Sequence, residues 1–192
     1  MVGLHRMKDI ENAQSRTDAK LRYAALHLEE LRNHERKGSG DDFERSHQEA
    51  FLYQLFGVRD AFLQELNLYY SCGLALHEVR LGRIRKFLRE QGKTSPELDV
   101  LSSLEDDLGS WLNVAKEMRD HSTHRQSVPR VFHVGGDDDG KVTLQDPRTK
   151  DHLTGDQIQV LDSWLKEMEQ LIRPLRSSAL KAYQSNNCVN SE

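Results

Sequence analysis

The sequence is poor in residues that break helices or cross-link chains. Its 192 residues include only four prolines and two cysteines. Few prolines allow long uninterrupted helices, because proline removes a backbone donor and clashes with the preceding turn. Cys72 and Cys188 lie far apart and have no metal-binding or redox spacing. This cysteine usage excludes a disulfide framework and is typical of a reducing compartment.

Long apolar runs are also missing. No segment approaches the ~20 apolar residues of a membrane-spanning helix, and residues 1–9 hold no apolar run of signal-peptide length. We therefore expect a cytoplasmic protein with no membrane partner. The net charge of −4 excludes a generally basic nucleic-acid binder. Any contact with nucleic acid must then come from a local basic patch.

What the chain does have is helical periodicity. Charged residues make up 30% and hydrophobic residues 36%, a balance typical of amphipathic helices with wide solvated faces. Apolar positions at three- and four-residue steps predict helices over 9–37, from Asp41-Asp42 past Tyr69, over 98–119, and from Thr154 or Asp156 onward. The clearest stripe is Phe51, Leu55, Val58, Phe62, Leu66 and Tyr69.

Beyond Pro129 the period changes, and 130–134 and 141–145 read as two strands joined by a loop rich in glycine and aspartate. The expected fold is an all-α, up-and-down four-helix-type bundle with a small β-hairpin inserted before the last helix. We expect one domain over 1–184 and a disordered polar tail over 185–192. Buried side chains should include Leu55, Phe62, Leu108, Trp111, Leu161 and Leu165.

The stretch richest in chemistry is 118–125, where Arg119, Asp120 and His124 lie within about one and a half helical turns. Arginine forks onto phosphate oxygens, and histidine moves protons near neutral pH. Asp120 is four residues before His124, so on a helix its carboxylate could orient the imidazole. The same spacing occurs by chance about once in such a chain, and Arg22 with His27 is a decoy in the middle of the first helix.

Residues 119–124 (Arg-Asp-His-Ser-Thr-His) resemble the arginine, polar residue, three variable residues, histidine signature of the HEPN superfamily. That resemblance implies a homodimer that cleaves RNA without a metal ion or cofactor, with Arg119 on the scissile phosphate, His124 in proton transfer and Asp120 in the polar position. Some members are toxins neutralised by an antitoxin protein. Gln126 stands where toxins paired with a nucleotidyltransferase commonly have tyrosine, so regulation at that position does not carry over.

The segment 77–93 is the only strongly basic element, and its cationic side chains are candidates for contact with RNA phosphates. The predicted RNA-binding residues are Arg80, Arg83, Arg85, Lys86, Arg89 and Arg125. A solvated helix face is the alternative interpretation of the same charges.

Two other functions stay open. A non-catalytic helical module for interaction or RNA binding would have the same bundle, with the 119–124 cluster serving as a charged helix end. A metalloprotein would use the histidines near the motif, His121, His124 and His133, as ligands in a helical bundle. A measurement of bound metal distinguishes the metalloprotein from the other functions. RNA binding without cleavage distinguishes the non-catalytic module.

Overall fold

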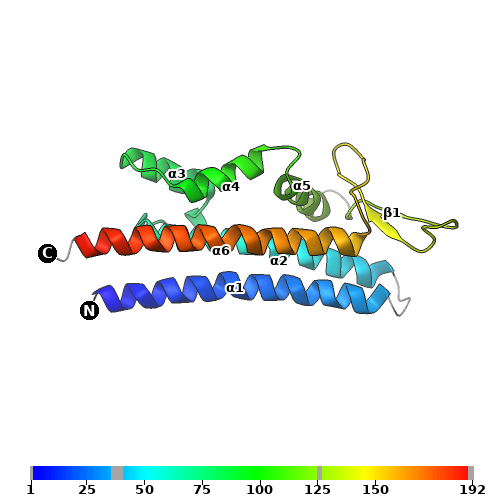
Figure 1. The fold of residues 1–192 in the computed structure, drawn as a ribbon, viewed down its shortest axis with the longest axis horizontal. Helices are drawn as coiled ribbons and strands as arrows, with labels where there is room; N and C mark the ends of the chain where they lie inside the picture. Colours follow the sequence, from blue (N-terminus) through cyan, green and yellow to red (C-terminus); the bar gives the residue numbers. More distant parts are fainter. Residues whose placement is uncertain (1, 36–40, 125–126, 190–192) are drawn as a thin grey trace.

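Three long helices form the body of the protein. The computed structural model describes residues 2–35, 41–124 and 127–189, with side chains described for 7–34, 41–123 and 127–185. Helix α1 (Val2–Glu35) runs antiparallel to α2 (Asp41–Tyr69) and to α6 (Gln157–Val189), and all three contact one another (Figure 1). Helix α6 continues past Ser185, where the sequence predicts that the polar tail begins.

Shorter helices form a second layer on α2 and α6, on the side away from α1 (Figure 1). After a 3-10 turn (Leu76–Glu78) they are α3 (Leu81–Glu90), α4 (Pro96–Asp106) and α5 (Trp111–His124). As Ser95-Pro96 suggests, Ser95 caps α4 by accepting a hydrogen bond from the backbone N–H of Leu98 at 3.3 Å. With 72% helix and the hairpin described below, the predicted fold class is confirmed.

The continuous helix expected over 98–119 is wrong, because the chain breaks between α4 and α5. Ser110 donates its hydroxyl to the carbonyl oxygen of Leu104 and accepts from the N–H of Asn113 at 3.1 Å, so it caps the start of α5. The break turns Leu108 outward, and this residue is 69% exposed instead of buried as predicted.

The hairpin packs against the start of α2. Strands β1 (Arg130–Phe132) and β2 (Val142–Leu144) pair antiparallel, with Val131 opposite Thr143. Arg130 is the link to the bundle, because its guanidinium pairs with Asp41 and, at 3.1 Å, with Glu44. The strands are shorter than predicted, but their position before the last helix is as expected.

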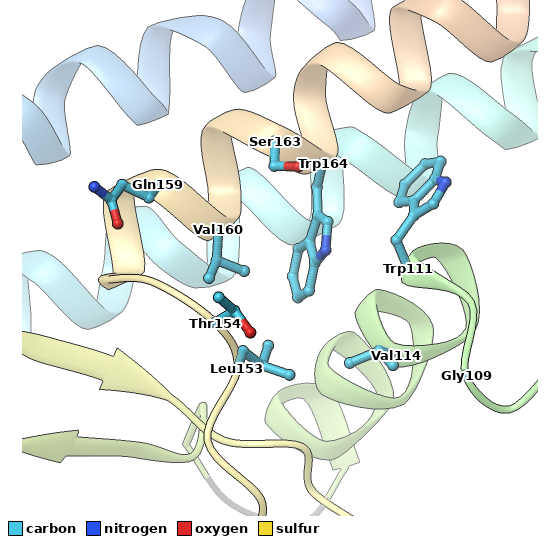
Figure 2. A pocket seen from close by; sticks show the side chains of 9 residues that line it. All are labelled: Gly109, Trp111, Val114, Leu153, Thr154, Gln159, Val160, Ser163 and Trp164. Atoms are coloured by element: carbon cyan, nitrogen blue, oxygen red, sulfur yellow. The ribbon is translucent and has the colours of Figure 1, made fainter.

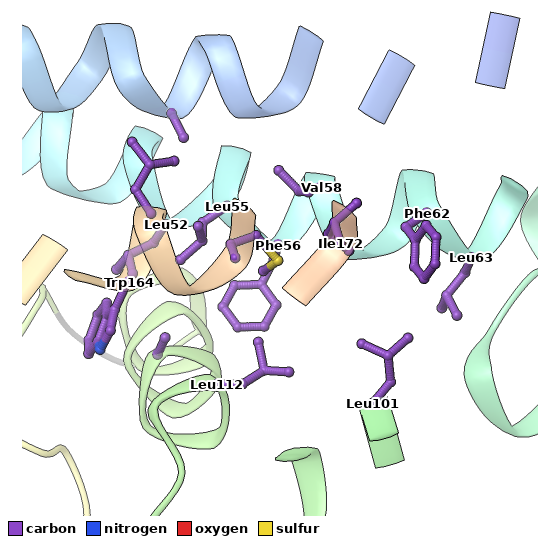
Figure 3. Close-up of a cluster of buried hydrophobic side chains, with 14 of the residues drawn as sticks. Leu52, Leu55, Phe56, Val58, Phe62, Leu63, Leu101, Leu112, Trp164 and Ile172 are labelled. Atoms are coloured by element: carbon purple, nitrogen blue, oxygen red, sulfur yellow. The ribbon is translucent and has the colours of Figure 1, made fainter. Parts of the chain in front are cut away.

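The apolar core lies between the two layers and around α2. Figure 3 shows Phe56, Phe62 and neighbouring leucines of α2 meeting Leu112 of α5, Leu101 of α4 and Ile172 of α6. The predicted burial of Leu55, Phe62, Leu161 and Leu165 is confirmed. Trp111 packs against this core but is only partly buried.

One charged network ties the three long helices together. Glu65 of α2 is fully buried and accepts two hydrogen bonds from Arg176 of α6, each at 2.8 Å. Arg176 also pairs with Asp18 of α1 at 2.8 Å. The Tyr69 hydroxyl donates to Glu65 at 3.2 Å, and burial raises the pKa of Tyr69 to about 12. This network fixes the relative register of α1, α2 and α6.

Among the described residues, no helix is both long enough and apolar enough to span a membrane.

Candidate functional site

Arg119 lies on the flank of α5. The helix buries Leu112, Ala115 and Met118 against the bundle, which places Arg119 at the edge of this apolar face. Its guanidinium carbon is 4.6 Å from the centre of the Phe56 ring of α2, a cation–π contact. The Arg119 side chain keeps 28% exposure. The cation is therefore held in place by packing and remains accessible from one side.

Asp120 orients that guanidinium. Its Oδ1 accepts from Nε of Arg119 at 2.9 Å and from Nη2 at 2.5 Å, while Lys116 Nζ lies 3.4 Å from its Oδ2. Burial alone would raise the pKa of Asp120, but the hydrogen bond and charge of Arg119, followed by Lys116, outweigh it and lower this pKa. Asp120 is therefore an ionised partner of two cations.

His124 is the last residue of α5, and its side chain lies outside the described residues, as do Arg125 and Gln126. The predicted contact of Asp120 with His124 thus remains a prediction. On a regular helix, five residues separate His124 from Arg119 by about 7.5 Å along the axis and about 140° around it. Ser122 and Thr123 both donate their hydroxyls to the carbonyl oxygen of Arg119 at 2.9 Å, so both side chains fold back onto the preceding turn of the helix.

The histidines proposed as an alternative metal site lie on different elements of the fold. His121 is on α5, whereas His133 follows β1 and contacts the Thr143 hydroxyl at 3.0 Å. Thr143 in turn contacts His152, also at 3.0 Å. Among the side chains that the structure describes, no group of three or more histidine, cysteine, aspartate or glutamate residues is arranged to hold a metal ion.

The predicted basic patch lies on α3 and its N-terminal flank. Ile84 and Leu88 bury the inner face of this helix, which leaves its cations exposed on the outer face. The predicted cations placed there by the structure are Arg80, Arg83, Arg85, Lys86 and Arg89. α3 and α5 belong to the same layer and are separated by α4 (Figure 1).

Several of these cations already have acidic neighbours. Arg83 lies 3.2 Å from Glu78, Arg85 lies 3.4 Å from Asp99, and Lys86 lies 3.9 Å from Glu90. Such exposed ion pairs contribute only about 0–1 kcal/mol each. A polyanion can therefore compete for these side chains at little cost.

The decoy pair on α1 has a different environment. The Nδ1 atoms of His27 and His47 are 3.1 Å apart, so His27 joins α1 to α2. Burial, followed by the charge of His47, lowers the pKa of His27. Arg22 is exposed. Arg22 and His27 lie in the middle of α1, whereas Arg119 and His124 lie in the last two turns of α5.

Sequence reasoning did not find a small pocket at the start of α5. It has a volume of about 240 Å³ and lies between α5, α6 and the loop that precedes α6 (Figure 2). Both tryptophans of the chain line it: Trp111 from the first turn of α5 and Trp164 from α6. The signal in the sequence is weak, because a tryptophan on an amphipathic helix also fits an ordinary core position.

The fold and this site together define a two-layered helical protein with an oriented arginine at the end of a short helix. Residues 7–181 match DUF6586, a family of unknown function. The match spans most of the chain, so the protein belongs to this family. No curated protein and no solved structure matches the chain.

Proposed function

We propose that this protein is an RNA-directed, HEPN-like protein that cleaves RNA without a metal ion, through Arg119 and His124. The observation that carries the proposal is the environment of Arg119. Arg59, Arg130 and Arg176 are each paired with a carboxylate of a different helix or strand from their own. Arg119 instead pairs with its neighbour Asp120 and keeps an exposed edge. Its ion pair links no two elements, and its contact with Phe56 of α2 leaves one edge of the guanidinium open, which supports a role in anion binding.

The chemistry requires little more than these residues. His124 accepts the proton of a ribose 2′-hydroxyl, the 2′-oxygen attacks the adjacent phosphorus, and the bond to the 5′-oxygen breaks. Arg119 offsets the charge that accumulates on the phosphate in the transition state. The leaving 5′-oxygen takes a proton from a second acid.

A homodimer supplies that second acid. Because Arg119 and His124 diverge by about 140° on one helix, a single chain directs them toward different places. A two-fold axis beside the end of α5 would bring the Arg119 and His124 side chains of both chains into one cleft, where the second imidazole serves as the acid. Light scattering at micromolar concentration tests this assembly, and a strictly monomeric protein would contradict the composite site.

Cleavage of a fluorescent single-stranded RNA tests the catalytic roles. Arg119→Ala and His124→Ala should each remove activity, with about 10²–10⁴-fold expected for the loss of a histidine proton transfer. Arg22→Ala and His121→Ala are matched controls that should retain activity, and EDTA should have no effect. Cleavage that survives His124→Ala, or that stops on chelation, would contradict the mechanism.

The basic face of α3 should contribute to RNA binding and take no part in RNA cleavage. The triple variant Arg83→Ala, Arg85→Ala, Arg89→Ala should weaken RNA binding and flatten its dependence on salt, because phosphate contacts release counterions. The cleavage rate at saturating RNA should stay unchanged. An unchanged salt slope would remove α3 from the RNA-binding surface.

A second candidate is a non-catalytic helical interaction module, and one observation favours it. Asp120 occupies the Nε–Nη2 edge of Arg119, which a phosphate would have to share or displace. In such a module the wild-type protein binds RNA or a protein partner and cuts nothing. An antitoxin-like partner is likewise a proposal, and copurification from the native host tests it.

A further inference from the structure

The pocket between α5 and α6 has a composition that suits a flat, uncharged ring. Trp164 projects from α6 toward α5 and the loop holding Leu153, while Trp111 rises from α5 toward α6 (Figure 2). Val114 and Val160 add apolar surface. None of its nine lining residues is charged. A charged ligand group would therefore have no counter-ion inside the pocket, whereas an aromatic ring could contact indole and aliphatic surfaces.

The polar atoms of the pocket are few and available. The hydroxyls of Thr154 and Ser163 lie among the lining side chains, and each can donate one hydrogen bond and accept others. Within the described part of the chain neither hydroxyl has a hydrogen-bond partner. Both residues are exposed, so their hydrogen bonds go to solvent or to a ligand. An apolar slot with a polar rim is the usual composition of a small-molecule site.

The volume limits the size of the ligand. An apolar cavity of about 150 Å³ is enough to bind benzene. The 240 Å³ here therefore suits a one- or two-ring system and is smaller than typical sites for drug-sized ligands. The sugar and phosphate of a nucleotide would remain outside, in the solvent.

We propose that this pocket binds a nucleobase of single-stranded RNA, by contact of the base with the partly exposed ring of Trp111 and with the small exposed part of Trp164, whose ring is otherwise buried. Stacking of bases on aromatic side chains is a common mode of single-strand recognition. This inference rests on the proposed function for the identity of the ligand. The location supports it, because Trp111 and Arg119 lie on the same helix, about 12 Å apart along its axis. A base held at Trp111 would align the strand along α5 toward Arg119.

Intrinsic fluorescence offers a direct test, because the only two tryptophans of the chain both line the pocket. The 192-residue chain is titrated with AMP, CMP and ribose 5-phosphate, with excitation at the red edge of tryptophan absorption, where the bases do not absorb. AMP and CMP should change the emission with saturation, and ribose 5-phosphate should not. An equal response to ribose 5-phosphate, or no response to either nucleotide, would overturn the proposal.

Substitutions in the pocket test whether AMP binds there. Trp111→Ala removes a partly exposed ring and should weaken AMP binding about 5- to 150-fold, read from the emission of Trp164. Ser163→Met adds bulk at an exposed lining position and should abolish the response with both indoles in place. Ser177→Met, at an exposed position further along α6, is the matched control and should bind AMP like the wild type. Unchanged AMP binding in Ser163→Met would place the base elsewhere and overturn the assignment.

Benzyl alcohol distinguishes a base site from a general apolar slot. If it binds as tightly as AMP, the pocket accepts any small ring and the nucleobase assignment fails. The two proposals also fail separately. RNA cleavage without any response to nucleotides would overturn the pocket alone. A saturable response to AMP in a protein that never cuts RNA would overturn the nuclease and keep the base site.

Discussion

The buried ion pair of Arg176 with Glu65 should dominate the response of the bundle to a single substitution. Glu65 has no exposed surface, and the Arg176 side chain is only 20% exposed. Replacing Arg176 with methionine keeps a long apolar side chain in place but removes both 2.8 Å hydrogen bonds to the carboxylate. Within the described network, Glu65 would then keep only the hydroxyl of Tyr69, at 3.2 Å.

The magnitude follows from the charge left behind. Removing one partner of a buried ion pair costs about 3–5 kcal/mol, because the remaining charge is desolvated without compensation. The free energy of unfolding of a typical domain is about 5–15 kcal/mol, so this loss is a large fraction of it. For a chain of this size, each kcal/mol lowers Tm by about 2–4 °C. We therefore expect Arg176→Met to lower Tm by about 6–20 °C.

Urea unfolding followed by far-UV circular dichroism measures the change. The double variant Glu65→Met, Arg176→Met removes both charges and should recover most of the loss, because an apolar pair needs no compensating charge. Asp18→Ala is the control on the same network. Asp18 is 45% exposed, so losing its contact with Arg176 should cost below about 1 kcal/mol.

Two results would refute this reasoning. A cost below about 1 kcal/mol for Arg176→Met would mean that water or a rearranged side chain compensates Glu65. A double variant no more stable than Arg176→Met alone would mean that lost packing, and not the unpaired charge, causes the destabilisation.

Three further predictions concern stability. Phe62→Ala should cost about 3–5 kcal/mol in urea unfolding, because Phe62 is fully buried, and a smaller loss would mean that the core collapses around the cavity. Leu108→Ala should cost below about 0.5 kcal/mol, because Leu108 is 69% exposed, and a core-sized loss would contradict the break between α4 and α5. The lowered pKa of His27, due to burial and then to His47, means that its contribution is present above about pH 6.5 and is lost as pH falls through the folded-state pKa. Stability measured from pH 7.5 to 5 should therefore depend less on pH in His27→Gln, and an unchanged dependence would exclude His27 as its source.

The sequence alone determined those features that depend on neighbours within one or two turns. The stripe from Phe51 to Tyr69 predicts a buried helix face, and each of its six positions is buried. Ser95-Pro96 predicts a helix start, and the cap is present. These signals are local because a helical period and a cap involve only residues three or four positions apart. The same reasoning identified 119–124 as a helix end rich in charged groups.

At Leu108 the apolar periodicity was not enough to predict where the helix ends. The apolar spacing continues through this position, but the Ser110 cap and the turn at Gly109 end one helix and begin another. A stripe records only which residues would share a face if the helix continued. Whether it continues depends on the balance between that face and the capping hydrogen bonds, and the apolar pattern does not contain this balance.

The tertiary structure alone decided which charges and rings meet. Glu65 reads as a solvated residue of an amphipathic helix, yet it is fully buried against Arg176, which is 111 positions away in the chain. The same holds for Phe56 beneath Arg119 and for the pocket shared by Trp111 and Trp164. Such contacts depend on the rotation and register of packed helices, which are set by the fit of whole surfaces. The sequence of one helix describes only one of the two surfaces that meet in such a contact.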